Sequence, residues 1–565
     1  MALEGVEAAG QLGPVRLEPL VELAKGLGAQ AVEPALGVAA HLDEAGVAQH
    51  LEVPGHAGLV HADGIDELGH RTLAAPHGVE DPAASRFGDH IEDGELAGHA
   101  VTIRPTIYMY NRISWWIRCR AVTGRSGDDG RPTSVASVAS GSMSAPAPRP
   151  VDVLVVGAGP AGSAAAIALS RAGREAVVVD RARFPRDKIC GDGLTTSALR
   201  ELEALGLDPS RVPSWVDVDE VVLRSPVGRE IDLPLPHGQG RFAAVARRAD
   251  LDHALVDLAR TAGSEVHEGC GLRSATVTPD DTIVAEVDGL GAVEARHLVA
   301  ADGMWSPTRR MLGVAVEGYR GEWHALRQYY VDVSPRAARE LVVWFEPDLL
   351  PGYMWSFPIQ GGCANVGFGI TRDGSYRVGD MGALWRELLA RPHVREWLGP
   401  DARPEGTHRA WPIPARIGGP TLAHGPALFV GDAAAAADPM TGEGIGQALL
   451  TGRWAAEAIL DAGPDEAIAP RYRAQVEAEL AVDHRFADTL MRVLRDRRGL
   501  RASLWAAGTN DWTRRNFARW LFEDYPRALL LTPSRWHRGM LQGPGAYQST
   551  GTPAAGSPTA GSAGR

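Results

Sequence analysis

Three glycines stand where a short run of valine and leucine gives way to a run of small residues. Gly157, Gly159 and Gly162 have the spacing GxGxxG, within VDVLVVGAGPAGSAAAIAL. In a nucleotide-binding turn the first glycine allows the tight bend, the second a close backbone approach to a pyrophosphate, and the third a close helix–strand contact. Unpaired N–H groups and the positive dipole of the helix that opens at Pro160 and Ala161 would face the phosphates. The spacing predicts a site for the diphosphate of a dinucleotide.

A strand before this turn, a helix after it and a second strand must hold it in place. Residues 151–156 are mostly β-formers, small helix-formers continue to Gly173, and a second apolar run, 176–179, ends at Asp180. A carboxylate at that strand end can accept hydrogen bonds from an adenosine ribose, and Arg181 follows it. The complete strand–turn–helix–strand unit favours a dinucleotide site over a glycine-rich turn of another α/β protein. This pattern does not distinguish an FAD site from an NAD site.

Length, charge and cysteine content exclude several classes of protein. The chain has 565 residues, enough for two or three domains, and a net charge of −13, which argues against nucleic acid as a partner. No run reaches the eighteen or so apolar residues of a membrane span. The cysteines are Cys119, Cys190, Cys270 and Cys363. They form no CxxC pair and no metal-ligand cluster, so we expect a reduced, cytoplasmic protein without a metal site.

The two ends of the chain differ in character from its middle. Residues 1–142 show no sustained helical or strand periodicity, and residues 124–150 are rich in Ser, Gly, Pro and Ala. We interpret Met143 as the true start and 1–142 as a misassigned upstream stretch, with a mostly disordered extension as the alternative. Residues 143–150 are then a linker, and 545–565 are predicted to be a disordered tail.

A loop after the second strand, FPRDKICGDGL, holds further candidates. Lys188 is one of two lysines against 55 arginines. A compact ammonium near a phosphate or a flavin edge would explain it, although a chance lysine explains the count equally well. Cys190, Gly191 and Gly193 predict a flexible loop whose backbone could lie against a planar ring. Arg248, just ahead of a predicted helix, is available to a phosphate or ribose, whereas Asp250 or Asp252 would cap that helix.

Two later strands end in polar residues, as the first one does. A predicted strand at 296–300 runs into ADGMWSPTRR with Asp302, and another at 427–430 runs into GDAAAAADPMTGEGIGQALL with Asp432. In that second segment Gly442 and Gly444 lead into a helix that begins near Ile445. Open α/β sheets bind ligands beyond the carboxyl ends of their strands, so we expect these residues to share one site.

Residues 318–370 change to a series of β-runs, which predicts an antiparallel sheet in a second domain. Within it Tyr353, Trp355 and Phe357 alternate along one strand and therefore share a face. Such a row packs a core or walls a pocket for an apolar substrate. The chain then becomes helical, and the aromatic and arginine residues of 481–544 suit an amphipathic helix packed on the core, with a membrane surface as the alternative.

Several stretches together resemble a known family. The GxGxxG with Asp180, ADGMWSPTRR and GDAAAAADP are similar to single-component FAD-dependent reductases and hydroxylases with the p-hydroxybenzoate-hydroxylase fold. Within that group, KICGDGL (188–194) and YMWSFP (353–358) resemble the KxCG and YxWxFP motifs of the geranylgeranyl reductase family. CANVGFGI (363–370) and PMTGEGI (439–445) are similar to that family as well. The resemblance covers about 151–542.

The resemblance implies a fold and a set of site residues. The fold is α/β: a Rossmann-like FAD-binding domain with a mixed sheet (151–315 and 416–480), an antiparallel-sheet substrate domain (316–415) and C-terminal helices (481–544). Cys190 and Tyr353 are the candidate proton donors. FAD would contact Gly157, Gly159, Pro160, Ala161, Gly162, Asp180, Arg181, Lys188, Cys190, Gly191, Gly193, Arg248, Leu272, Asp302, Asp432, Gly442, Gly444 and Ile445, and substrate would contact Tyr353, Trp355 and Phe357.

The implied reaction is the saturation of isolated double bonds in a prenyl chain on a lipid, quinone or diphosphate by hydride from reduced flavin. No second GxGxxG is present, so NADPH or another reductant would dock without its own Rossmann domain. We expect a hydrophobic prenyl substrate and no obligate protein partner. A flavin-dependent monooxygenase or halogenase is the alternative function. The halogenase pattern is WxWxIP, but here Tyr353 stands in place of its first Trp and Phe357 in place of its Ile. A non-enzymatic flavin-binding module is the weakest alternative.

Overall fold

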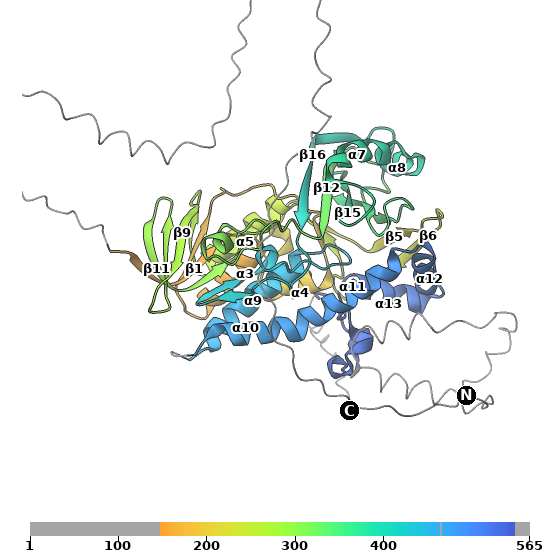
Figure 1. The fold of residues 1–565 in the computed structure, drawn as a ribbon. Helices are drawn as coiled ribbons and strands as arrows, with labels where there is room; N and C mark the ends of the chain where they lie inside the picture. The colour runs from red at the N-terminus through yellow and green to blue at the C-terminus, as the bar shows by residue number, and fades with distance from the viewer. Residues whose placement is uncertain (1–146, 464–465, 549–565) are drawn as a thin grey trace, which may run out of the picture. The chain divides into compact units, whose positions relative to one another are not determined.

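The computed structural model describes residues 147–463 and 466–548 (Figure 1). The predicted start at Met143, the stretch before it and most of the predicted tail lie outside these residues.

An eight-stranded sheet carries the predicted nucleotide turn. In its centre β1 (Arg149–Val156) pairs in parallel with β2 (Ala176–Asp180) and β11 (Gly291–Ala300). The remaining strands are β8 (Glu265–Glu268) beside β2, β18 (Ala427–Phe429) and β17 (Ala423–His424) beyond β11, and the antiparallel pair β9 (Leu272–Val277) and β10 (Ile283–Val287). Because β1, β11 and β18 are parallel neighbours, the turns that follow them lie at one edge of the sheet.

Both faces of the central strands are covered. Val153, Leu154 and Val155 are all fully buried although successive side chains of a strand point to opposite faces. On one side α3 (Pro160–Arg171) packs closely against α9 (Ile445–Asp461). A Cβ atom on Gly452 would lie 2.1 Å from the carbonyl oxygen of Ala161, so only glycine permits this contact.

The predicted second sheet has seven strands. Its strands in order are β16 (Arg403–Ile413), β12 (Trp323–Val331), β15 (Cys363–Thr371), β14 (Tyr353–Ile359), β13 (Leu341–Trp344), β5 (Glu220–Arg224) and β6 (Glu230–Pro234). The strands β12, β13, β14 and β15 correspond to the predicted β-runs of 318–370. Two features were not predicted: β13 pairs with β5 in parallel, so the sheet is not wholly antiparallel, and β5 and β6 come from a part of the chain that precedes β11.

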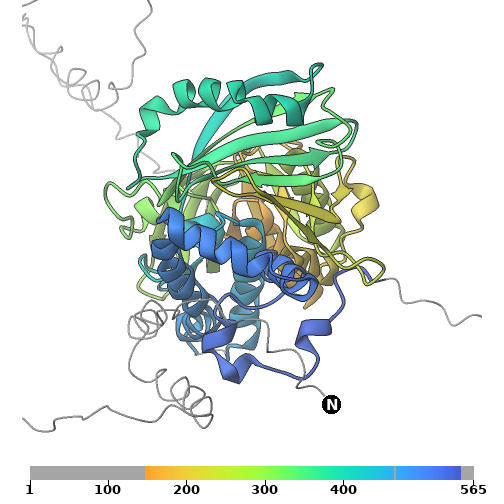
Figure 2. The ribbon, with the colours of Figure 1, turned by 90° about the vertical axis from the view of Figure 1, so that its right-hand side faces the viewer.

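Helices cover both faces of this second sheet, as Figure 2 shows. On one face α7 (Met381–Ala390) and α8 (Pro392–Leu398) bury Met354 and Phe368. On the other face α12 (Arg497–Ala507) and α13 (Asp511–Leu521) pack on Leu223 and Leu341. Alternation along β14 therefore directs Tyr353, Trp355 and Phe357 away from α7 and α8.

The remaining elements connect these layers. The helices are α4 (Thr196–Ala204), α5 (Arg248–Thr261), α6 (Pro307–Met311), α10 (Ile468–Val476) and α11 (Val482–Leu494), and a small sheet joins β3 (Gly193–Leu194), β7 (Ala244–Val245) and β4 (Val216–Asp217).

Candidate active site

One cavity of about 1180 Å³ lies where the strand ends of the first sheet meet the β14 aromatic residues of the second. Every predicted site residue lines it except Gly162. Gly162 faces inward instead, because a Cβ there would lie 1.8 Å from the carbonyl oxygen of Gly157. The structure thus brings the predicted cofactor residues and the predicted substrate residues into one space, while the contact of each with a ligand stays a prediction.

The three glycines of the first turn differ in what they permit. Gly157 has φ +104°, and a Cβ on it would lie 2.4 Å from the carbonyl oxygen of Ala301. At Gly159 the nearest atom to an added Cβ is Nη2 of Arg186, 3.6 Å away, so this position opens into the cavity. Gly157 and Gly162 are required by the protein's own packing, whereas Gly159 leaves room for a ligand.

Asp180 holds the glycine turn itself. Its Oδ2 accepts a hydrogen bond from the N–H of Ala158 and its Oδ1 one from the N–H of Ala182, each at 2.8 Å. A carboxylate has about four acceptor positions, so it can still accept from a ribose hydroxyl as predicted.

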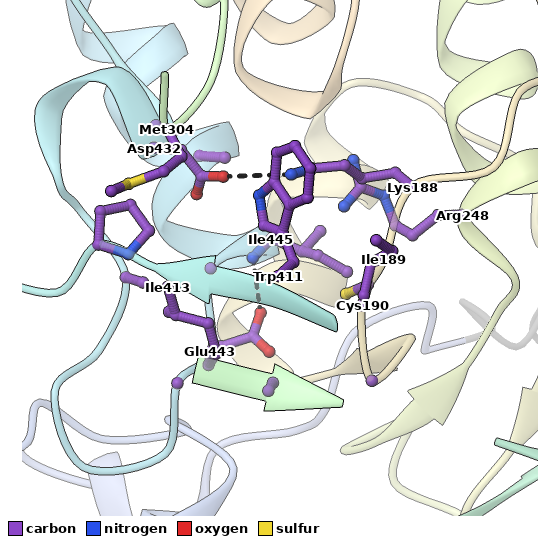
Figure 3. A pocket seen from close by; sticks show the side chains of 18 of the residues that line it. Lys188, Ile189, Cys190, Arg248, Met304, Trp411, Ile413, Asp432, Glu443 and Ile445 are labelled. Carbon is purple, nitrogen blue, oxygen red and sulfur yellow. Dashed lines mark hydrogen bonds and ion pairs between the residues drawn. The ribbon is translucent and has the colours of Figure 1, made fainter. Parts of the chain in front are cut away.

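Lys188 and Asp432 face each other across the cavity. Lys188 Nζ lies 3.6 Å from Asp432 Oδ2 and 4.3 Å from the ring centre of Trp411, and Figure 3 shows this arrangement. Burial lowers the pKa of the Lys188 ammonium. Trp411, on β16, was not predicted as a site residue because that strand was not recognised in the sequence.

Hydrogen bonds set the path of the Cys190 loop in the structure, while its predicted flexibility stays a prediction. The carbonyl oxygen of Cys190 accepts from Asn365 Nδ2 at 2.9 Å. Asp192, with φ +65°, accepts from Asn365 Nδ2 at 2.9 Å and from the Tyr329 hydroxyl at 2.6 Å. A Cβ on Gly193 would lie 3.3 Å from the Phe357 ring, so the loop also packs on the aromatic wall. Burial raises the pKa of Cys190 to about 11, and its thiol is neutral.

Arg248 is buried in an ion pair beside this loop. Its guanidinium donates to both oxygens of Asp252, at 2.8 and 2.9 Å, and Arg186 pairs with the same carboxylate at 2.9 Å. The predicted capping role for Asp250 or Asp252 was wrong, since no side chain caps the start of α5. Asp252 instead neutralises two arginines that line the cavity.

Asp302, like Asp180, is tied to its own turn. Its Oδ1 accepts from the Ser306 hydroxyl at 2.6 Å and its Oδ2 from the N–H of Thr308 at 2.8 Å, which holds the start of α6. Both oxygens are engaged within the turn, and the predicted contact of Asp302 with FAD stays a prediction.

Three aromatic rings form one wall of the cavity. The ring centres of Tyr353 and Trp355 are 5.9 Å apart, and those of Trp355 and Phe357 are 6.0 Å apart. Trp355 Nε1 donates to Asn365 Oδ1 at 3.2 Å, and the Tyr353 hydroxyl donates to the carbonyl oxygen of Thr441. Burial raises the pKa of Tyr353. A hydroxyl already engaged with a backbone carbonyl is a poor proton donor.

The cavity continues into an apolar chamber that the sequence did not reveal. The second sheet and the C-terminal helices form its two sides. It is lined by Val221, Leu223, Leu341, Val343 and Phe345 on the sheet side and by Leu490, Met491, Leu494, Leu500, Leu504, Phe517 and Trp520 on the helix side.

The site fits FAD. A glycine face at the start of α3 and the cations Arg186 and Lys188 can receive the diphosphate. The Cys190 loop and the start of α9 both line the cavity. Within the part of the chain that the structure describes, no group of three or more His, Cys, Asp and Glu side chains is placed to hold a metal ion.

Comparison with known proteins settles the family. Residues 150–450 match the FAD binding domain family. The menaquinone reductase of Mycolicibacterium smegmatis is 35% identical over 55% of this chain and 77% of its own length. A digeranylgeranylglycerophospholipid reductase of Methanopyrus kandleri is 31% identical over 60% of this chain and 84% of its own. The chain belongs to the geranylgeranyl reductase family of FAD-dependent oxidoreductases.

Solved structures share the fold of this reductase-family chain. A geranylgeranyl bacteriochlorophyll reductase-like protein of Thermoplasma acidophilum has a TM-score of 0.57 and 21% identity, over 69% of this chain and all of its own. The flavin-dependent brominase Bmp2 has a TM-score of 0.55 and 20% identity, over 68% of this chain and 98% of its own. At these identities the likeness concerns the fold alone. The matched FAD binding domain and the reductase relatives, rather than these structures, identify the protein as an FAD-dependent oxidoreductase.

Proposed function

We propose that the protein saturates isolated double bonds in a prenyl chain carried by a lipid, a quinone or a diphosphate. The observation that carries the proposal is the continuity of the cavity. The same space that holds the predicted FAD residues opens into an apolar chamber walled by β14 and the C-terminal helices. The names of the two relatives, a menaquinone reductase and a phospholipid reductase, support a substrate with a prenyl chain.

The chain's own residues supply binding, orientation and exclusion of water. Reduced FAD, when bound, supplies a hydride. An isolated alkene develops no oxyanion for the protein to stabilise, so holding the double bond at the correct distance matters most. Each buried methylene of the substrate contributes about 0.8 kcal/mol to its binding. The chamber residues Leu223, Leu500 and Leu504 would hold the chain by this effect, and Trp355 would orient the reacting bond.

The test is an anaerobic reaction. Enzyme reduced chemically with dithionite is mixed with geranylgeranyl diphosphate or a menaquinone, and the product is analysed by mass spectrometry. We expect a gain of two hydrogens per reduced double bond without oxygen. A gain of oxygen or halogen, seen only in air, would replace the proposal by a monooxygenase or halogenase, whose fold this chain shares.

We further propose NADPH as the physiological reductant. Arg181, Arg273 and Arg310 line the same cavity and offer cations to its phosphates. Anaerobic mixing with NADPH should bleach the flavin absorbance faster than mixing with NADH. If neither nucleotide bleaches the flavin, another reduced carrier is the electron donor.

We also propose that α12 and α13 touch a membrane surface. Trp505 and Trp512 are 63% and 57% exposed, beside the exposed Arg498 and Arg501. The opposite side of the same helices lines the apolar chamber, so a lipid substrate could enter there. No helix of the described part is long and apolar enough to cross a membrane. The double variant Trp505→Ala, Trp512→Ala should sediment less with anionic vesicles than the parent protein, and equal sedimentation would refute the contact.

A further inference from the structure

A group of three carboxyls and one guanidinium lies at the start of α9. The acids are Asp438, Glu443 and Glu523, and the cation is Arg527. Asp438, Glu523 and Arg527 are almost wholly shielded from solvent. A single guanidinium cannot neutralise three buried carboxylates, and an unpaired buried charge is strongly disfavoured.

Asp438 and Glu523 take up the available positive charge. Arg527 Nε lies 3.2 Å from Asp438 Oδ2, and Arg527 Nη2 lies 3.3 Å from Glu523 Oε1. Asp438 also accepts from the N–H groups of Met440 and Thr441, at 2.9 and 2.7 Å. These contacts hold the pKa of Asp438 below its usual value although the group is buried.

Within residues 147–463 and 466–548, no Lys, Arg or His side chain forms an ion pair with Glu443. Its Oε1 accepts from the N–H groups of Ile445 and Gly446, each at 3.0 Å, and Figure 3 shows the bond to Ile445. These two bonds favour the carboxylate, but burial and repulsion from the nearby Glu523 carboxyl outweigh them and raise the pKa of Glu443 to about 8. Burial raises the pKa of Glu523 as well, although Arg527 opposes this. Glu443 also lines the cavity, between the predicted flavin residues Gly442 and Gly444.

We propose that Glu443 is the proton donor of the reduction: its carboxylic acid protonates the alkene carbon that does not receive the hydride. The proposal rests on the prenyl reductase function above. The carbon–carbon π bond breaks, one carbon gains the hydride of the two-electron donor, dihydroflavin, and the other gains the Glu443 proton. Glu443 is left as a carboxylate and regains its proton from water.

The two donors predicted from sequence are weaker acids. The Cys190 thiol, with a pKa of about 11, gives up its proton far less readily at neutral pH. The Tyr353 hydroxyl donates to Thr441. A general acid works best when its pKa lies near the operating pH, and Glu443 meets this condition where Cys190 does not. Asp192 also lines the cavity and has a pKa of about 6, but its carboxylate already accepts hydrogen bonds from Tyr329 and Asn365.

Several ionisable groups act on Glu443 and set the pH at which it titrates. Glu523 and Asp438 act on it directly, Arg527 and His484 act on Asp438, and Cys190 and Tyr353 interact with it across the cavity. An acid donates only while protonated, so the rate should fall as the pH rises through about 8. Removal of the Glu523 charge by Glu523→Gln should move this midpoint to lower pH.

The experiment uses the FAD-loaded enzyme and Glu443→Gln, which keeps the acceptor for α9 but carries no acidic proton. Infrared difference spectra between pH 6 and pH 9.5 should show a protonated carboxyl band with a midpoint near 8 in the parent protein and not in the variant. Glu443→Asp should shift the frequency of that band. The shift would assign the band to this side chain even if Glu443→Gln loses FAD. Glu457→Gln, on α9 but away from the cavity, should keep the band. If the parent protein shows no such carboxyl band, the proposal is overturned, whichever substrates the enzyme reduces.

The reaction provides a second, independent readout. Glu443→Gln should keep its FAD absorbance, lose about 10²–10⁴-fold in the rate of double-bond reduction, and lose the fall in rate near pH 8. An unchanged rate would overturn the proposal. If the parent protein reduces no prenyl substrate, the proposed function fails, while the infrared titration still decides whether Glu443 carries a proton.

Discussion

A side chain at Gly159 should separate cofactor binding from folding. An added Cβ meets nothing closer than Nη2 of Arg186, at 3.6 Å, and the backbone at this residue has φ −74°, which any residue adopts. Gly159→Ala should therefore leave the fold intact. A glycine-to-alanine change at such a position stabilises a protein by about 0.4–1 kcal/mol.

The expected loss is in FAD affinity. The methyl group would occupy the face that a pyrophosphate must approach, and each lost hydrogen bond to a charged group costs about 1.5–3 kcal/mol. One lost bond corresponds to about a 10- to 150-fold weaker Kd. Gly159→Val should weaken it further because its side chain is larger.

The assay titrates FAD into the flavin-free protein by calorimetry and follows thermal unfolding of the same sample. Gly157→Ala is the matched comparison. Its Cβ would lie 2.4 Å from the carbonyl oxygen of Ala301 at φ +104°, so this variant should lose stability as well as FAD. Undiminished FAD affinity in Gly159→Val would show that the phosphates bind elsewhere.

Three further changes probe other walls of the cavity. Asp432→Ala removes the partner of Lys188 and should weaken FAD binding about tenfold or more, measured by flavin absorbance after gel filtration; full retention would exclude Asp432 from the cofactor site. Trp355→Phe should retain FAD but lower the rate of prenyl reduction about tenfold or more, because the indole that donates to Asn365 and walls the chamber is lost; an unchanged rate would place the substrate elsewhere. Gly352→Phe should lower the free energy of unfolding by about 3 kcal/mol or more, because even its Cβ would lie 2.3 Å from the carbonyl oxygen of Gly369; a normal thermal midpoint would contradict the packing at the start of β14.

Local sequence determined the nucleotide turn. Gly157, Gly159 and Asp180 lie within one strand–turn–helix–strand unit, whose geometry follows from backbone sterics and hydrogen bonds between near neighbours. The same reasoning found the start of α9 at Ile445 and the shared face of Tyr353, Trp355 and Phe357, because strand and helix periods are local properties.

Only the tertiary structure revealed the rest of the cavity. Trp411 lies on a strand whose sequence, RPEGTHRAWPI, is largely polar and exposed, so no apolar period marks it. The chamber joins β5, β13 and α12, which are far apart in the sequence and meet only through strand pairing and helix packing. The periodicity of each element predicted a buried face, but it could not predict against which other element that face would pack.

The ionisation of Glu443 depends most completely on the folded chain. In the sequence, TGEGIG suggests no more than an acid near a helix start, where a carboxylate is ordinarily stabilised. Burial and the carboxyl of Glu523, which lies far along the chain in sequence, reverse this preference once the chain folds. The identity of an acid is a property of sequence, whereas its pKa is set by the charges and the solvent that surround it in three dimensions.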